Sequence, residues 1–218
     1  SDLAAVPEGC SYVLALACAD LVVAAPGASG SGFGDPQRAV NGVRGGGTSA
    51  GGQDVYSMGL EAGVNDSLVL AWSGRRVVDA PGVDLVIFEN PFEAAGPSAV
   101  FMDLVIVEVS ADGENWWAFP HSYGEASYSS DPADWIGFAG RTPVLLHEEE
   151  NSVDPLDSSL AGGDGFDLAD LAAPELLASG VAYVRLRSAG TEYPSEPISN
   201  GPDIDGLYAA ELVEDAGR

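Results

Sequence analysis

The sequence predicts an all-β fold, an antiparallel β-sandwich. Short strand-like runs recur along the chain, Gly, Pro, Asn and Asp separate them, and the apolar residues show almost no helical spacing. With 218 residues the chain can bury a sizeable core, and sandwiches of this length often form one domain. We therefore expect residues 1–218 to form a single domain, with residues 1–26 as an N-terminal strand segment.

The strand-like runs are rich in Val, Leu, Ile and aromatic residues, which favour a pleated, half-buried surface. In chain order they cover residues 21–25, 55–60, 67–72, 84–89, 104–110, 116–119, 181–187 and 207–213. Turn-forming residues lie between consecutive runs, as expected for strands joined by tight connections.

Residues 105–119 read as a β-hairpin. Val105, Val107 and Val109 alternate with other residues, and Asp112 followed by Gly113 is a common hairpin turn. The second strand then resumes with an aromatic run that contains Trp116, Trp117 and Phe119. Because strand residues alternate between two faces, at least one of the two tryptophans belongs in the core.

Helical signals are weak. Between residues 166 and 177, Phe166, Leu168, Leu171 and Leu176 could share one helical face, but Pro174 should end such a helix. We expect one or two short helical turns. Two longer irregular segments, residues 27–52 and 120–165, are candidates for functional loops.

The composition is strongly acidic. There are 34 Asp and Glu residues against 8 Lys and Arg residues, a formal net charge of −26. Such a charge repels nucleic acid and anionic lipid, so neither is an expected partner. A solubilising acidic surface in a salt-adapted organism explains the charge as well as a cation-binding function does.

The two cysteines, Cys10 and Cys18, do not have the spacing of a metal or redox motif. A disulfide between them is the favoured interpretation and would place the protein outside the cytoplasm; two buried thiols are the alternative. The apolar stretch at residues 12–25 is too short to span a membrane, so we expect no membrane span.

Several stretches together are similar to a known fold. The hairpin at 105–119 resembles the valine-rich strand and Ser-x-Asp-Gly-x-x-Trp turn of the discoidin-like, or galactose-binding-like, jelly roll. Residues 35–48, 181–186 and 210–213 resemble an early loop, the penultimate strand and the closing strand of that family. The resemblance implies a jelly-roll β-sandwich with long loops, in a family that mostly binds ligands rather than catalysing reactions.

Residues 82–92 and 162–170 resemble segments of uncharacterised bacterial proteins that are secreted or anchored at the cell surface. This resemblance implies that the protein is secreted or lies at the cell surface.

The jelly-roll resemblance also implies a structural calcium ion where the early loop meets the last strand. Carried onto this sequence, its ligands are Asp35, Asn41, Thr48 and Glu211. Asn41 stands where the family usually has an aspartate, which lowers the charge of this ligand set.

The acidic residues suggest a second calcium site. Asp203 and Asp205 lie two positions apart and would face the same way in an extended segment, where Asp84 and Glu89 could join them. Turn capping and strand termination are the alternative roles for these residues. The carboxylates at positions 164, 167 and 170 are ligands or helix caps.

Sugar binding requires an aromatic platform and polar groups for the hydroxyls. The segment 120–165 offers both, and the candidate ligand-binding residues are His121, Tyr123, Tyr128, Trp135 and Arg141. The predicted function is a secreted or cell-surface calcium-binding module, not an enzyme, that recognises a carbohydrate or another extracellular or cell-surface partner. The alternatives are a structural or adhesive surface protein and, with less support, a glycoside hydrolase that uses paired carboxylates.

Overall fold

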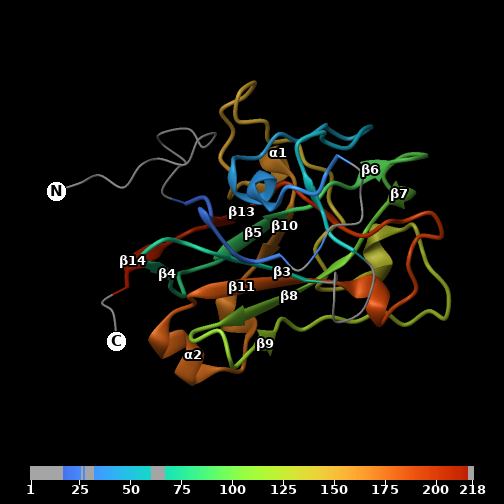
Figure 1. The fold of residues 1–218 in the computed structure, drawn as a ribbon. Helices are drawn as coiled ribbons and strands as arrows, with labels where there is room; N and C mark the ends of the chain where they lie inside the picture. Colours follow the sequence, from blue (N-terminus) through green and yellow to red (C-terminus); the bar gives the residue numbers. More distant parts are fainter. Residues whose placement is uncertain (1–16, 26, 28–31, 60–66, 216–218) are drawn as a thin grey trace.

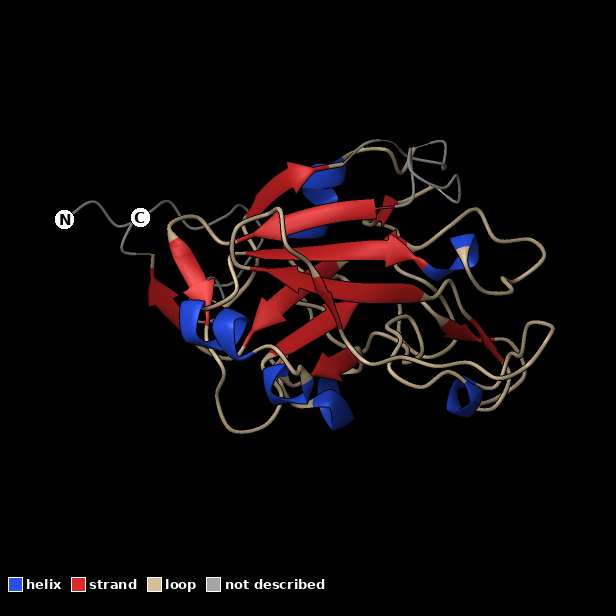
Figure 2. Ribbon diagram, turned by 90° about the horizontal axis from the view of Figure 1, so that it is seen from below, coloured by secondary structure: helices blue, strands red, loops and turns tan. Residues whose placement is uncertain are grey.

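The computed structural model describes residues 17–25, 27, 32–59 and 67–215. It is mostly β, with antiparallel sheets and a few short helices (Figures 1 and 2). Most of the predicted N-terminal segment 1–26 lies outside the described residues. The coarse expectation of an antiparallel all-β fold is confirmed.

The largest sheet has five strands in the order β1-β3-β11-β8-β9. Their bounds are Leu21–Ala24 for β1, Ser67–Ala71 for β3, Tyr183–Ser188 for β11, Val105–Ser110 for β8 and Trp117–Ala118 for β9. In the centre of this sheet, β11 pairs with β3 on one side and with β8 on the other (Figure 1). Buried and part-exposed residues alternate along β11, as expected for a strand with one core face.

A second sheet has the order β10-β5-β13. Its strands are Asp164–Phe166, Leu85–Phe88 and Gly206–Ala209, respectively. All four residues of β5 are buried, because both faces of this central strand are covered. Two acidic residues of the sites described below flank this strand: Asp84 directly precedes β5 and Glu89 directly follows it.

Three two-stranded ladders complete the strands. They are β12-β2 (Asp203–Ile204 with Tyr56–Ser57), β14-β4 (Leu212–Glu214 with Arg75–Val77) and β6-β7 (Phe92–Glu93 with Val100–Phe101). The helices are short: α1 (Ser158–Ala161), α2 (Pro174–Ser179), η1 (Pro36–Val40), η2 (Pro132–Asp134), η3 (Leu168–Asp170) and η4 (Ala189–Thr191).

The main hydrophobic cluster takes side chains from both larger sheets. Val107 and Leu186 of the five-stranded sheet share it with Ile87 and Leu207 of the three-stranded sheet. Ile106, which points to the other face of β8, belongs to a separate cluster with residues of the long segment 120–140. That segment is therefore packed onto the sheet.

Each of the eight predicted strand segments contains an observed strand, and the hairpin at 105–119 is confirmed as β8 and β9. The predicted run 207–213 is two strands, because the chain changes partner: β13 pairs with β5, whereas β14 pairs with β4. The short strands β4, β6, β7, β10 and β12 were not predicted.

The helical interpretation of residues 166–177 is corrected. Pro174 begins α2 at its first helical position, where the missing N–H is not needed, instead of ending a helix. Phe166, Leu168, Leu171 and Leu176 are all buried in the main cluster, but they come from β10, η3, a connecting residue and α2. The spacing of these four residues therefore does not come from one helix, because separate elements bring them to the same core.

Candidate metal centre and neighbouring clefts

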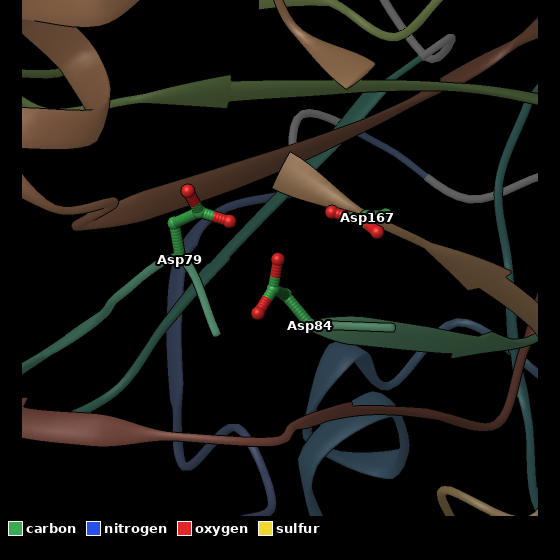
Figure 3. A group of neighbouring side chains, drawn as sticks. All are labelled: Asp79, Asp84 and Asp167. Atoms are coloured by element: carbon green, nitrogen blue, oxygen red, sulfur yellow. The ribbon is translucent and has the colours of Figure 1, made fainter. Parts of the chain in front are cut away.

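Three aspartates from separate segments meet at one end of β5. One carboxylate oxygen from each of Asp79, Asp84 and Asp167 lies within 4.8 Å of the other two, and Figure 3 shows the three side chains converging. We call this group the aspartate triad.

Sheet pairing positions the triad. Asp84 stands directly before β5, where its backbone N–H donates to the Phe166 carbonyl of β10 at 2.9 Å. Asp167 follows β10, so this pairing brings both residues together across a sequence separation of more than 80. Asp79 follows β4, and the neighbouring Val78 N–H donates to the Glu211 carbonyl at 3.2 Å.

The electrostatics of the triad favour a cation. Asp84 is fully buried, and its two oxygens accept from the backbone N–H groups of Ala80 and Leu168, both at 2.8 Å. Burial raises the pKa of Asp84, the two backbone hydrogen bonds oppose that rise, and the charges of Asp167 and Asp79 add to it. Within the described part of the chain, no ion pair reaches any of the three carboxylates.

The donor set contains oxygen alone, which suits hard cations such as Ca²⁺ and does not suit the softer metals that prefer imidazole or thiolate. Asp167 uses one oxygen to cap η3, accepting from Ala169 N–H at 2.9 Å. The sequence named Asp84 as a ligand and Asp167 as a ligand or cap. Asp79 was missed, because a single exposed aspartate after a strand carries no pattern.

Glu89 and Asp203, predicted to share a site, do lie together. Glu89 Oε1 accepts from the Asp203 backbone N–H at 2.9 Å. Asp205 does not join them: both of its oxygens accept from the Arg44 N–H at 3.0 Å, and it lies between β12 and β13 rather than in one extended strand. Asp84 belongs to the triad instead. The predicted four-carboxylate group is therefore divided among three places.

The ligands implied by the family resemblance have separate local contacts. Asp35 caps η1 by accepting from Gln37 N–H at 3.0 Å, and Asn41 donates to Asp54 at 2.9 Å. The Thr48 hydroxyl lies 3.5 Å from that of Ser49, and Glu211 is exposed. None of these contacts joins one of the four residues to another, so this calcium site remains a prediction.

The predicted sugar platform is placed differently. Trp135 is fully buried, its indole N–H donates to the Ser129 carbonyl at 2.8 Å, and Tyr123 stacks on it with ring centroids 3.5 Å apart. The Trp135 ring therefore packs the segment 120–140 and offers no open face in this structure. Tyr128 belongs to the same cluster, and its hydroxyl accepts from Met102 N–H at 3.2 Å.

His121 also packs locally: Phe138 and Tyr193 lie edge-on to its ring, with ring centroids 5.1 Å and 6.0 Å away.

Arg141 lines a cleft of about 370 Å³. The apolar wall consists of Ile136, which is exposed, and of Phe119 and Phe138, which are buried. Asp170 adds a carboxylate. The Arg141 guanidinium donates to the Phe138 carbonyl at 2.8 Å and lies 3.4 Å from the buried Asp164 carboxylate, which fixes its position. We call this the Arg141 cleft. Of the five predicted ligand-binding residues, Arg141 is the one that lines it.

Cys18 is buried and its thiol lies 3.4 Å from the Ala19 carbonyl. The described residues contain no disulfide, and Cys10, the predicted partner of Cys18, lies outside them. No helix in the described part of the chain is long and apolar enough to cross a membrane. Comparison with models of known protein families, with curated proteins and with solved structures found no match.

Proposed function

We propose that the protein is a calcium-binding β-sandwich module of the discoidin-like jelly-roll type, secreted or at the cell surface, that recognises a carbohydrate. The observation that carries the proposal is the convergence of Asp79, Asp84 and Asp167 without a basic partner in the described residues. A divalent cation would offset the repulsion among these carboxylates.

Calcium suits the triad better than magnesium. Calcium accepts about six to eight oxygens in flexible geometry, whereas magnesium requires a near-ideal octahedron. The three carboxylates come from three different segments, and Asp79 is exposed, which leaves room for water to complete the shell. Extracellular fluids supply calcium at the millimolar concentrations that such surface sites need.

The triad and the Arg141 cleft share a short connection. Asp167 caps η3, and η3 ends at Asp170, which lines the cleft. On the other side of Asp167, β10 carries Asp164, which holds Arg141. A cation bound at Asp167 would therefore stabilise the two segments that present the polar groups of the cleft.

We expect calcium to raise the melting temperature by several degrees. Binding to the folded state contributes about 1.4 kcal/mol when free calcium is about ten times its Kd. The measurement compares thermal unfolding in EDTA with unfolding in millimolar calcium. Asp79→Asn should remove most of the gain without lowering stability in EDTA, because Asp79 supplies charge to the triad and the substitution relieves repulsion.

Glu125→Gln is the matched control, since Glu125 is an exposed acid in another loop and its substitution should leave the calcium response intact. Magnesium at the same concentration should give a smaller shift. Identical melting curves in EDTA and calcium would rule out the cation part of the proposal.

The carbohydrate part predicts saturable glycan binding in the Arg141 cleft. Its apolar wall suits the hydrophobic face of a sugar, and its carboxylate and guanidinium suit the hydroxyls. Glycan-array screening would identify a binder, and Ile136→Ser and Asp170→Asn should each weaken it about tenfold. Leu160→Ser, which changes another exposed apolar residue, is the control. No binding to any glycan with calcium present would contradict this part.

A further inference from the structure

A second cleft has a volume of about 300 Å³. It shares no lining residue with the triad or the Arg141 cleft. Its acidic groups are Asp103 and Asp203, and its apolar surface comes from Phe33, Phe101 and Ile198. Among the described residues that line it, none is basic. We call it the Asp103–Asp203 cleft.

A third carboxyl group, that of Glu89, contacts a residue that lines this cleft. Glu89 is 2 % exposed; its Oε1 accepts from the Asp203 backbone N–H, and its Oε2 is buried with no hydrogen-bond partner. The backbone comes close at this point: a Cβ on Gly140 would lie 3.2 Å from Oε2 and 2.8 Å from the Asp103 carbonyl oxygen. The substitution of Gly140 by any larger residue would therefore crowd the acidic group.

The carboxyl groups at the cleft hold their protons more tightly than free carboxyl groups do, and burial raises the pKa of Asp103 to about 7. Burial is the largest cause that raises the pKa of Glu89, and the charges of Asp103 and Asp203 raise it further. In the described residues, no ion pair forms with Glu89, Asp103 or Asp203. Burial raises the pKa of Asp203, and the hydrogen bond that the Ser57 hydroxyl donates to its carboxylate opposes that rise.

The residues that line the cleft suit an organic cation better than an inorganic one. An inorganic divalent ion requires about six to eight oxygen ligands, whereas three of the eight lining residues have large apolar side chains. An organic ammonium ion uses both surfaces, since its charge pairs with carboxylates while its carbon chain contacts aromatic and aliphatic side chains. Arg38 lies over the Phe33 ring, 5.7 Å from its centroid. Phe92 stacks on one face of Phe101, with ring centroids 5.2 Å apart, so the opposite face of Phe101 is the ring surface left for a ligand.

We propose that the Asp103–Asp203 cleft binds a small organic cation, an alkylammonium group whose charge lies between Asp103 and Asp203 and whose carbon chain lies against Phe101 and Ile198. A free amine and a lysine side chain share this chemistry. The site is independent of the proposed calcium and carbohydrate functions, because it shares no residue with the triad or the Arg141 cleft.

Isothermal titration of the full chain with pentylammonium tests the proposal, with neutral 1-pentanol as the matched probe. In EDTA and 150 mM NaCl, we expect saturable binding of one pentylammonium and no saturable binding of 1-pentanol. Asp103→Asn and Asp203→Asn should each weaken the binding about tenfold or more. Titration with the amide of N-acetyl-lysine then shows whether the site also accepts a lysine side chain.

Two controls separate this cleft from the acidic surface as a whole. Asp79→Asn changes the triad, and Asp170→Asn changes the Arg141 cleft; both should leave pentylammonium binding unchanged. If Asp203→Asn fails to fold, Phe101→Ala tests the apolar wall instead and should also weaken binding. Absence of saturable binding, equal binding of 1-pentanol, or binding that Asp103→Asn leaves unchanged would overturn the proposal.

Discussion

Asp205 shows how one buried carboxyl links stability to pH. Burial raises its pKa to about 8, the N–H of Arg44 opposes that rise, and the charge of Asp54 adds to it. The folded state therefore holds this proton more tightly than the unfolded chain does. Its stabilising contribution is complete below pH 4 and is lost as pH rises from about 4 to 8.

Asp205→Asn should make the free energy of unfolding less dependent on pH. The wild type should lose up to about 1.4 kcal/mol per pH unit more than the variant between pH 5 and 8, and at pH 8 the variant should be at least as stable. Asn can still accept one hydrogen bond from Arg44, which limits the cost at low pH. Urea unfolding at four pH values in EDTA measures both slopes.

Glu125→Gln, at an exposed position, should keep the wild-type slope. Parallel slopes for the wild type and Asp205→Asn would mean that the Asp205 carboxyl is already ionised in the folded protein at pH 5.

At the level of single residues, the sequence identified part of the candidate sites. Asp84 and Glu89 were singled out because they flank an apolar run. Asp203 was singled out by its spacing of two from Asp205, and Asp167 by the spacing of three among positions 164, 167 and 170. Asp79 follows a strand that was not predicted, and Asp103 directly precedes the predicted run 104–110 but was not singled out. Asp84 and Asp167 meet because β5 pairs with β10 across a long sequence separation. Strand pairing therefore decides which acidic residues meet, and their spacing along the chain does not predict it.

Among the elements, the best predictions came from local patterns. The β8–β9 hairpin was predictable because its turn is built from adjacent residues: Asp112 accepts from Glu114 and Asn115 N–H groups, and Gly113 has a φ of +78°. The division of residues 207–213 into β13 and β14 was not predictable, because it depends on a change of partner strand. Similarly, the sequence predicts Trp135 as a binding residue, but the segment 120–140 packs against β8 and buries its ring.

The net charge of −26 belongs to the molecule as a whole. The Arg residues in the described part of the chain are engaged locally: Arg185 and Arg187, for example, both pair with Glu108 on β8. Most acids therefore face other acids through solvent, and their mutual repulsion disfavours the compact state. Salt weakens this repulsion, because the Debye length falls from about 30 Å at 0.01 M to about 8 Å at 0.15 M.

We expect the melting temperature in EDTA to rise by several degrees when NaCl increases from 0.01 to 0.15 M. A double variant, Glu114→Lys and Glu125→Lys, changes two exposed acids and takes the net charge from −26 to −22. Its salt-induced gain should be smaller than that of the wild type, since less repulsion remains to be screened. Because EDTA removes divalent cations, this response is separate from calcium binding at the triad. A melting temperature that falls with salt would instead mean that the Arg ion pairs outweigh the repulsion among the carboxylates.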